Sequence, residues 1–347
     1  MKKLFIKFIT FLKKLFLIFF IIALSSSNVF AAPTHVVSHN INSEENTVTG
    51  IAFNPDGTKM FIVGIIGNEV NEYSLSVGFD LSSTVTWLRL LDVSAQDNKV
   101  QDVAFNSDGT VIFVIGKQRA NIDSWSLSTA YDLSGVHATN DLIATTALGG
   151  NPRALKFNPD GTKMFIVGRA GTDLNEYALS TAFDISSASF TGNGCTGGGS
   201  GATGAKPTAM NFNADGTKLF VLDKGSNIVR ESVLGTGFVI TSSCTYDDDN
   251  KSPNLNNMSG VSEAKAQGMA FNDDGTKMYI VGEQHDKVYE LDLLTAYDVS
   301  TETFVASFDI SNQEAVPTGL EFSSDGKTMF VVGKNGDEIN VYVLATA

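Results

Sequence analysis

Hydrophobic and polar positions along this chain follow a long-period repeat. Each copy contains a phenylalanine, a polar residue, any residue, Asp-Gly and a hydrophobic run that ends near a glycine, as in residues 53–64 (Phe-Asn-Pro-Asp-Gly-Thr-Lys-Met-Phe-Ile-Val-Gly). The copies begin at Phe53, Phe105, Phe157, Phe212, Phe271 and Phe322, at intervals of 52, 52, 55, 59 and 51 residues. A period of this length is typical of a repeat architecture.

Each repeat predicts four short antiparallel strands. In the first copy, an apolar stretch at 49–54 runs into Asn-Pro-Asp-Gly at 54–57, where proline presets φ and glycine tolerates the left-handed conformation of a hairpin turn. Residues 59–63 are apolar on both faces, as expected for a strand between two packed sheets. Residues 69–76 alternate, which indicates a strand further out. A Phe-Asp-Leu turn at 79–81 then leads to an outer edge strand.

Four strands per repeat at this spacing are typical of a β-propeller blade, and no segment after the N-terminal region has helical periodicity. We therefore predict an all-β fold, a six-bladed β-propeller of four-stranded antiparallel blades. The last repeat ends at Ala347 just after its third strand, and residues 34–41 resemble the fourth-strand segment 304–310. We expect the N-terminal strand to complete the last blade, which closes the ring and hides two sheet edges.

The repeat also resembles those of known proteins. Its core at 54–64 (Asn-Pro-Asp-Gly-Thr-Lys-Met-Phe-Ile-Val-Gly) and its tail at 177–186 (Tyr-Ala-Leu-Ser-Thr-Ala-Phe-Asp-Ile-Ser) are similar to secreted bacterial and phage β-propeller repeats of the TolB-like and YVTN types. The resemblance covers residues 34–347 and implies the fold. It leaves the function open, because such propellers include binding modules, enzymes and structural proteins.

The N-terminal segment predicts export. Five lysines precede an apolar run at 15–24 and a small-residue segment, which is the pattern of a secretory signal peptide. We place the cleavage after Ala31, with Ala32 as the next choice, so that residues 1–31 form the signal peptide and residues 32–347 a single propeller domain. An uncleaved membrane anchor is the alternative, but the apolar run is short for a bilayer. We expect a secreted protein, either periplasmic or extracellular.

Charge and cysteine content restrict the partners further. The chain has 38 acidic and 24 basic residues and a formal net charge of −14, so its surface repels phosphate backbones and anionic lipid, and nucleic acid is excluded as a partner. No membrane span is expected after signal cleavage. Cys195 and Cys244 predict one disulfide in an oxidising compartment. Cys195 lies in an insertion at 192–204, and a second insertion, at 246–262, closely follows Cys244, so this bond would pin two neighbouring loops.

The candidate binding residues lie on one face of the predicted propeller, around the central channel. We call it the variable face, because its connections differ between repeats. The first polar position of each inner strand forms a predicted ring at the channel mouth: Thr49, Gln101, Arg153, Thr208, Gln267 and Thr318, with Asp102 beside it. The connections between second and third strands add Lys117, Arg119, Arg169, Lys224, Glu283, His285 and Lys334. The basic side chains could hold a carboxylate, a sulfated sugar or an acidic peptide, or simply keep the loops solvated.

The opposite face is predicted to be structural. Its motif aspartates should each accept hydrogen bonds from their own turn: Asp56, Asp108, Asp160, Asp215, Asp274 and Asp325. No metal site is predicted, because the histidines share no ligand spacing and the acidic run at 247–250 lacks the spaced carboxylates of a calcium loop. The glycine-rich segment 199–206 departs from a phosphate-binding loop at Ala205.

These features favour a non-catalytic secreted recognition or scaffold propeller. It would bind a glycan, peptide or protein partner of the envelope or cell exterior on its variable face, with no catalytic residues and no cofactor. The alternatives are a metal-dependent lactonase-like hydrolase in the central channel and a structural adhesin or phage-type component. Against the hydrolase, the ring offers Thr, Gln and Arg where a channel metal needs carboxylates, and Asp102 alone would bind Ca²⁺ weakly.

Overall fold

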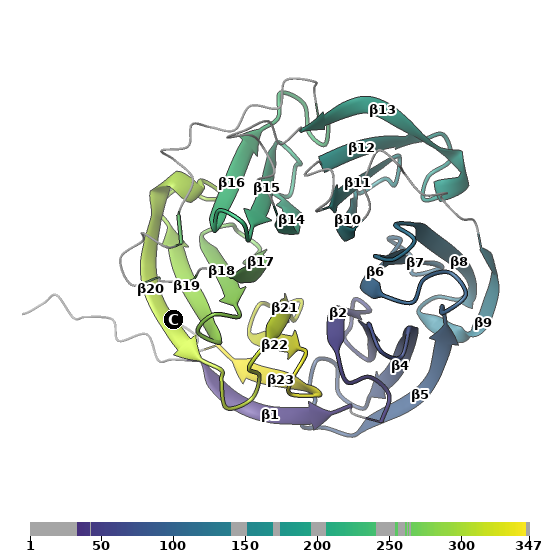
Figure 1. Ribbon diagram of the computed structural model, residues 1–347, viewed down its shortest axis with the longest axis horizontal. Coiled ribbons are helices and arrows are strands. Elements are labelled where there is room, and N and C mark those ends of the chain that lie inside the picture. Colours follow the sequence, from purple (N-terminus) through teal and green to yellow (C-terminus); the bar gives the residue numbers. More distant parts are fainter. Residues whose placement is uncertain are drawn as a thin grey trace, which may run out of the picture.

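The computed structural model describes residues 33–41, 43–139, 151–168, 174–195, 206–240, 254–255, 261, 263 and 265–344. These residues form six antiparallel sheets arranged around a central axis, which confirms the predicted six-bladed propeller (Figure 1). Five sheets have four strands each, and the described part of the fourth blade has three.

Each blade runs from an inner strand beside the axis to an outer strand at the rim. The first blade consists of β2 (Val48–Phe53), β3 (Lys59–Gly64), β4 (Glu69–Leu75) and β5 (Val85–Asp92). The second consists of β6 (Val100–Phe105), β7 (Val111–Gly116), β8 (Ile122–Thr129) and β9 (Asp132–Thr139). The third consists of β10 (Pro152–Phe157), β11 (Lys163–Gly168), β12 (Leu174–Leu179) and β13 (Ala188–Cys195), with the 3₁₀ turn η2 (Ile185–Ser187) before β13.

The remaining blades follow the same plan. The fourth contains β14 (Pro207–Phe212), β15 (Lys218–Asp223) and β16 (Ile228–Val233). The fifth contains β17 (Ala266–Phe271), β18 (Lys277–Gly282), β19 (Lys287–Leu293) and β20 (Glu302–Asp309), with the 3₁₀ turn η3 (Val299–Thr301) before β20. The sixth contains β21 (Pro317–Phe322), β22 (Thr328–Gly333), β23 (Glu338–Val343) and, from the other end of the chain, β1 (Thr34–Asn40).

The sixth blade joins the two ends of the propeller. β1 pairs antiparallel with β23 and forms the outer strand of the sheet β1-β23-β22-β21. The Ser38 hydroxyl donates a hydrogen bond to Asn340 Oδ1 (2.5 Å), and the Ile41 backbone N–H donates to the Asp337 carbonyl (3.0 Å). The predicted closure by the N-terminal strand is therefore confirmed.

Aromatic side chains pack between every pair of neighbouring blades. The second strand of each blade carries a buried aromatic ring that packs on the inner-strand phenylalanine of the next blade, at centroid distances of 4.5 to 4.9 Å. The pairs are Phe61–Phe105, Phe113–Phe157, Phe165–Phe212, Phe220–Phe271, Tyr279–Phe322 and Phe330–Phe53. Because the last pair connects the sixth blade to the first, this aromatic ladder is cyclic.

The Asp-Gly turns connect the first and second strands of each blade, on the face opposite the variable face. Asp56 Oδ1 accepts hydrogen bonds from the Thr58 hydroxyl (2.5 Å) and backbone N–H (2.9 Å). The same pair of bonds recurs at Asp108, Asp160, Asp215 and Asp274, whereas Asp325 accepts from the Ser323 hydroxyl and the Lys327 N–H. These bonds, chiefly those from the hydroxyls, lower the pKa of all six carboxyls.

One turn glycine shows why the motif needs this residue. Gly57 has a φ of +71°, and a Cβ on it would lie 2.2 Å from the ring of Phe79. The aromatic turn and the Asp-Gly turn therefore pack together on this face.

Some predicted features lie outside the described residues. They are the signal peptide (1–31), Arg169, Cys244 and the side chain of Cys195. Within the described residues, no helix is long and apolar enough to cross a membrane.

Candidate functional site

The inner strands β2, β6, β10, β14, β17 and β21 surround the axis (Figure 1). Residues of all six line a central cavity of about 710 Å³, which we call the channel. Along each inner strand, the second residue lies at the channel mouth and the third residue forms a second layer. In the third to sixth blades, the fifth residue forms a third layer.

A bulge near the start of every inner strand produces the first layer. In β2, Val48 pairs with Gly64 and Gly50 pairs with the adjacent Val63, so Thr49 has no partner in the ladder. The same irregularity occurs in the other five inner strands. Bulges redirect a side chain out of the regular alternation. The second residue of each inner strand is thereby available to the mouth.

Three members of the predicted ring connect adjacent blades. The Thr49 hydroxyl donates to the Val100 carbonyl of the second blade (3.0 Å), and the Thr318 hydroxyl donates to the Val48 carbonyl of the first blade (2.9 Å). Thr208 makes the equivalent bond to the fifth blade at 3.4 Å. These hydroxyls therefore stabilise the ring, and the long polar side chains of the ring come from the other three blades.

A smaller cavity of about 250 Å³ occupies the channel mouth. We call it the mouth pocket, and nine of the predicted binding residues line it: Thr49, Gln101, Arg153, Thr208, Lys224, Gln267, Glu283, Thr318 and Lys334. The ring and the connections after the second strands thus meet at one site.

Glu283 organises one side of the mouth pocket. Its Oε1 lies 2.6 Å from Lys224 Nζ, and its Oε2 accepts a hydrogen bond from the Gln267 amide. Burial opposes ionisation of this carboxyl, but the hydrogen bond and charge of Lys224 outweigh it and lower the pKa of Glu283. The carboxylate is therefore ionised at neutral pH and holds both side chains in place.

The net charge of the mouth pocket is positive. Arg153, Lys224 and Lys334 are its cations, and Glu283 is its one carboxylate among the described residues. On the other side of the pocket from Glu283, the Arg153 guanidinium donates to Gln101 Oε1. A cationic site on a chain of net charge −14 favours an anionic ligand.

Among the described residues, four of the predicted binding residues do not line the mouth pocket. Lys117, Arg119 and His285 belong to its surrounding loops, and the Arg119 guanidinium donates to the Ala95 carbonyl. Asp102 lies deeper, in the second layer.

The sequence analysis missed a set of buried carboxylates that hold the variable-face loops. Glu314 is typical, since it accepts backbone N–H groups from Val316 (2.7 Å), Asn335 (3.1 Å) and Gly336 (3.0 Å). The set comprises Glu45, Asp97, Glu263 and Glu314, each at most 2% exposed. Each precedes a ring residue by four positions, and this spacing is the signal that could have revealed them.

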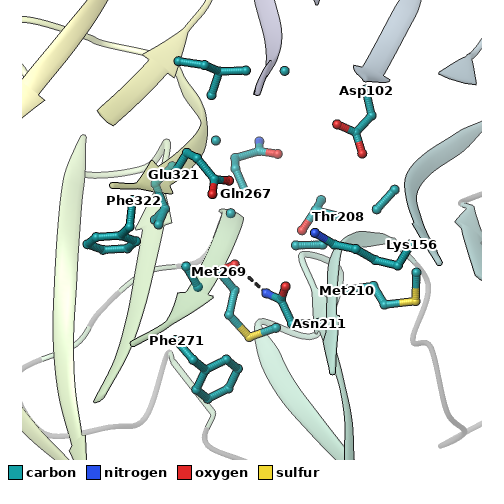
Figure 2. Close-up of a pocket in the computed structure, with 18 of the residues that line it drawn as sticks. Asp102, Lys156, Thr208, Met210, Asn211, Gln267, Met269, Phe271, Glu321 and Phe322 are labelled. Carbon is teal, nitrogen blue, oxygen red and sulfur yellow. Dashed lines mark hydrogen bonds between the residues drawn. The ribbon is translucent and has the colours of Figure 1, made fainter. Parts of the chain in front are cut away.

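Below the mouth, the channel is lined mostly by small side chains and carries few polar groups. Its second layer consists of Gly50, Asp102, Ala154, Ala209, Gly268 and Gly319, and its third layer consists of Lys156, Asn211, Ala270 and Glu321. Figure 2 shows Asp102, Lys156 and Glu321 extending from the walls into the cavity. Because glycine or alanine occupies every other position of these layers except that of Asn211, these polar side chains have open space before them.

The channel alters the ionisation of its two carboxyls. The surrounding walls raise the pKa of Asp102 to about 6, while Lys156 and the Val103 N–H (2.9 Å) oppose this rise. The walls also raise the pKa of Glu321, again opposed by Lys156, and the charge of Asp102 adds to the rise. The protonation of Asp102 therefore changes close to neutral pH.

The described residues do not fit a channel metal. Across them, no three His, Cys, Asp or Glu side chains converge as metal ligands. The metal-dependent form of the hydrolase hypothesis therefore has no donor set in this part of the chain, and we derive no step through a metal.

No protein-family model and no curated protein sequence matches this chain. Solved structures of similar fold include the periplasmic gluconolactonase of Pseudomonas aeruginosa, with a TM-score of 0.60 and 14% identity over 89% of this chain and 92% of that protein. A protein of Bacteroides fragilis NCTC 9343, provisionally named a 6-phosphogluconolactonase, has a TM-score of 0.60 and 13% identity over 85% of this chain and 79% of its own.

A third similar structure is the hydrazine synthase of Kuenenia stuttgartiensis, with a TM-score of 0.55 and 13% identity over 93% of this chain and 99% of that protein. At these identities the comparisons establish the propeller fold alone. The different activities named among the three show that this fold does not determine one function.

Proposed function

We propose that the channel recognises a small anionic sugar derivative at its mouth and hydrolyses a lactone ring of that ligand. The observation that carries this proposal is the order of the charged groups along the channel axis. The cations of the mouth pocket lie one layer above Asp102, whose pKa is about 6.

Recognition rests on the mouth pocket. Arg153, Lys224 and Lys334 provide charge-assisted hydrogen bonds for a carboxylate or phosphate, and Gln101 and Gln267 provide amide groups for hydroxyls. A volume of about 250 Å³ suits a ligand of the size of one sugar unit better than a drug-sized molecule.

Hydrolysis rests on Asp102. A carboxylate with a pKa of about 6 is largely ionised at neutral pH and basic enough to accept a proton from water. The water oxygen then attacks the lactone carbonyl carbon, the ring C–O bond breaks, and the proton passes to the departing ring oxygen. Lys156, which interacts electrostatically with Asp102, would stabilise the negative charge on the carbonyl oxygen. The product is the open hydroxy acid.

The names of two structural neighbours support lactone hydrolysis as the reaction to test first. The two proteins carry the names gluconolactonase and 6-phosphogluconolactonase, and both names describe enzymes for sugar lactones. We carry the activity over as a proposal because the identities of 13% and 14% concern the fold.

The second candidate is recognition without catalysis, with a glycan, peptide or protein as partner. It is favoured by the internal bonding of the mouth, in which Glu283 and Gln101 already hold the neighbouring side chains in fixed positions. Such preorganisation serves binding even when no bond is broken.

We also propose export through residues 1–31, which would make a periplasmic or extracellular ligand accessible.

A pH-stat assay with the δ-lactone of 6-phosphogluconate, whose phosphate supplies the anionic group for the mouth pocket, separates these candidates. The wild-type protein should release acid faster than buffer alone, Asp102→Asn should abolish the excess, and the rim variant Asp309→Asn should retain it. A rate equal to the buffer background, together with saturable binding of gluconate by calorimetry, would reject hydrolysis and retain recognition. Absence of both would reject the mouth pocket as a sugar-acid site.

A further inference from the structure

We infer that the channel contains a second ligand subsite, formed by Lys156, Asn211 and Glu321, that binds a neutral polyhydroxylated unit. This inference rests on the proposed function and narrows its ligand. The ligand would be an acidic oligosaccharide of at least two units, with the acid at the mouth and a neutral sugar deeper in the channel. We call these three residues the belt.

The belt is one layer of the channel. Its members are the fifth residues of β10, β14 and β21, so they lie at the same depth on three different blades. The fifth residue of the other three inner strands is alanine. Figure 2 shows Lys156, Asn211 and Glu321 around the same part of the cavity.

The polar atoms of the belt are available to a ligand. Within the described chain, the Lys156 ammonium has no hydrogen bond or ion pair, and the Glu321 carboxylate accepts a hydrogen bond from the backbone N–H of its neighbour Phe322. The two charged groups lie close enough to influence each other electrostatically. The Asn211 amide donates one N–H to the Met269 carbonyl (2.8 Å), which orients the group and leaves its oxygen as an acceptor. Lys156 and Glu321 are exposed to the cavity, so their remaining donors and acceptors, with the Asn211 oxygen, are accessible to a ligand.

The belt's chemistry matches a neutral sugar. It combines an ammonium donor, a carboxylate acceptor and an amide, with a formal charge near zero when both ions are present. Hydroxyl groups can donate to Glu321 and Asn211 and accept from Lys156. A second anion would face Glu321, and a cation would face Lys156, so both are disfavoured relative to a polyol.

The spacing sets the minimum length of the ligand. On β10, β14 and β21, the belt residue follows the mouth residue by three positions, which corresponds to about 10 Å of extended chain. This distance exceeds the width of one sugar ring. A single sugar acid held at the mouth would therefore leave the belt unused, whereas a linked pair of sugars could reach both.

Gly319 allows a direct test of this path. It belongs to the second layer, between the mouth and the belt, and a Cβ on it would contact only the Val332 side chain at an ordinary 3.6 Å. Its backbone does not have a positive φ. Gly319→Leu should therefore fold and place an obstruction in the channel below the mouth pocket.

The experiment compares two probes by titration calorimetry: glucuronic acid, and a disaccharide of glucuronic acid linked to a neutral hexose. The disaccharide should bind the wild-type protein at least ten-fold more tightly. Glu321→Gln and Gly319→Leu should each remove most of that advantage and leave the affinity for glucuronic acid unchanged. Lys327→Met, an exposed lysine on the opposite face, serves as the control and should change neither affinity.

The outcomes separate this inference from the function on which it rests. Equal wild-type affinities for the two probes, or belt variants that weaken both probes alike, would overturn the belt while the mouth pocket stands. If neither probe binds, the proposed function fails and the belt fails with it. Thermal melting of each variant shows whether a lost affinity comes from lost folding.

Discussion

Lys224 Nζ lies 2.6 Å from Glu283 Oε1, across the boundary between the fourth and fifth blades. Both side chains come from connections after a second strand, and both line the mouth pocket. The pair thus fixes a cation at the site through contact between two blades rather than within one. Its partner Gln267 is a ring residue, so the contact also connects the loops to the inner strands.

Removal of cations from the mouth should weaken ligand binding. Arg153→Gln should lower the affinity for gluconate by roughly ten-fold or more, because a hydrogen bond to a charged group contributes about 1.5–3 kcal/mol. Lys224→Met should have a similar effect and also release Glu283 and Gln267. Calorimetry at two salt concentrations checks this, since the wild-type affinity should fall with ionic strength. Unchanged affinity in both variants would place the ligand elsewhere.

Hydrolysis should follow the ionisation of Asp102. The base form is required, so the catalysed rate should rise with pH and level off above the pKa of about 6. Lys156 opposes the raised pKa, so Lys156→Met should move the midpoint of the profile to higher pH. The test is a series of initial rates from pH 5 to about 7.5, corrected for spontaneous opening of the lactone. A profile without a midpoint in this range contradicts the role of Asp102.

The N-terminal strand should stabilise the whole ring. Deletion of residues 34–41 removes β1, exposes the edge of β23 and takes away the buried Ile41. We expect a large decrease in melting temperature, measured by circular dichroism, relative to a protein that begins at residue 32. Equal melting temperatures of the two proteins would show that the sixth blade does not need this strand.

A buried carboxylate also connects neighbouring blades. Glu231 lies 2.5 Å from Lys218 Nζ and accepts the Val299 N–H of the fifth blade (2.9 Å). Glu231→Gln should lower the free energy of unfolding by about 1–3 kcal/mol, since it weakens a buried charged hydrogen bond. Glu321→Gln is the matched control, because the hydrogen bond of that carboxylate, from the Phe322 N–H, lies within its own blade. Urea unfolding measures both, and equal losses would argue against the inter-blade role of Glu231.

The predicted disulfide between Cys195 and Cys244 has a direct chemical readout. The intact mass of the exported protein should increase by two hydrogens after reduction, and alkylation without reduction should leave both sulfurs unmodified. Labelling of both cysteines in the native, unreduced protein would contradict the bond.

Much of this fold could be predicted from the sequence because its repeat carries strong local signals. The Asp-Gly turn, the apolar second strand and the missing fourth strand of the last repeat together specified the blade and its closure. The mouth residues followed from the same logic, since architecture alone places the second inner-strand residue near the axis.

The deeper channel was harder to predict for a physical reason. Lys156 and Glu321 occur in strands whose other residues are typical of a hydrophobic core. Their charges can be assigned to a shared channel only once the six inner strands are known to surround an axis. The bulge at the start of each inner strand also shifts the alternation, so the sequence pattern did not show that the third and fifth residues share the channel side.

The most direct test of the central claim is a crystal structure of the protein soaked with gluconate. We predict density for the sugar acid in the mouth pocket, with its carboxylate within hydrogen-bond distance of Arg153 and of Lys224 or Lys334. Density confined to the Asp-Gly face or to the outer strands, with the mouth pocket occupied by water alone, would contradict it.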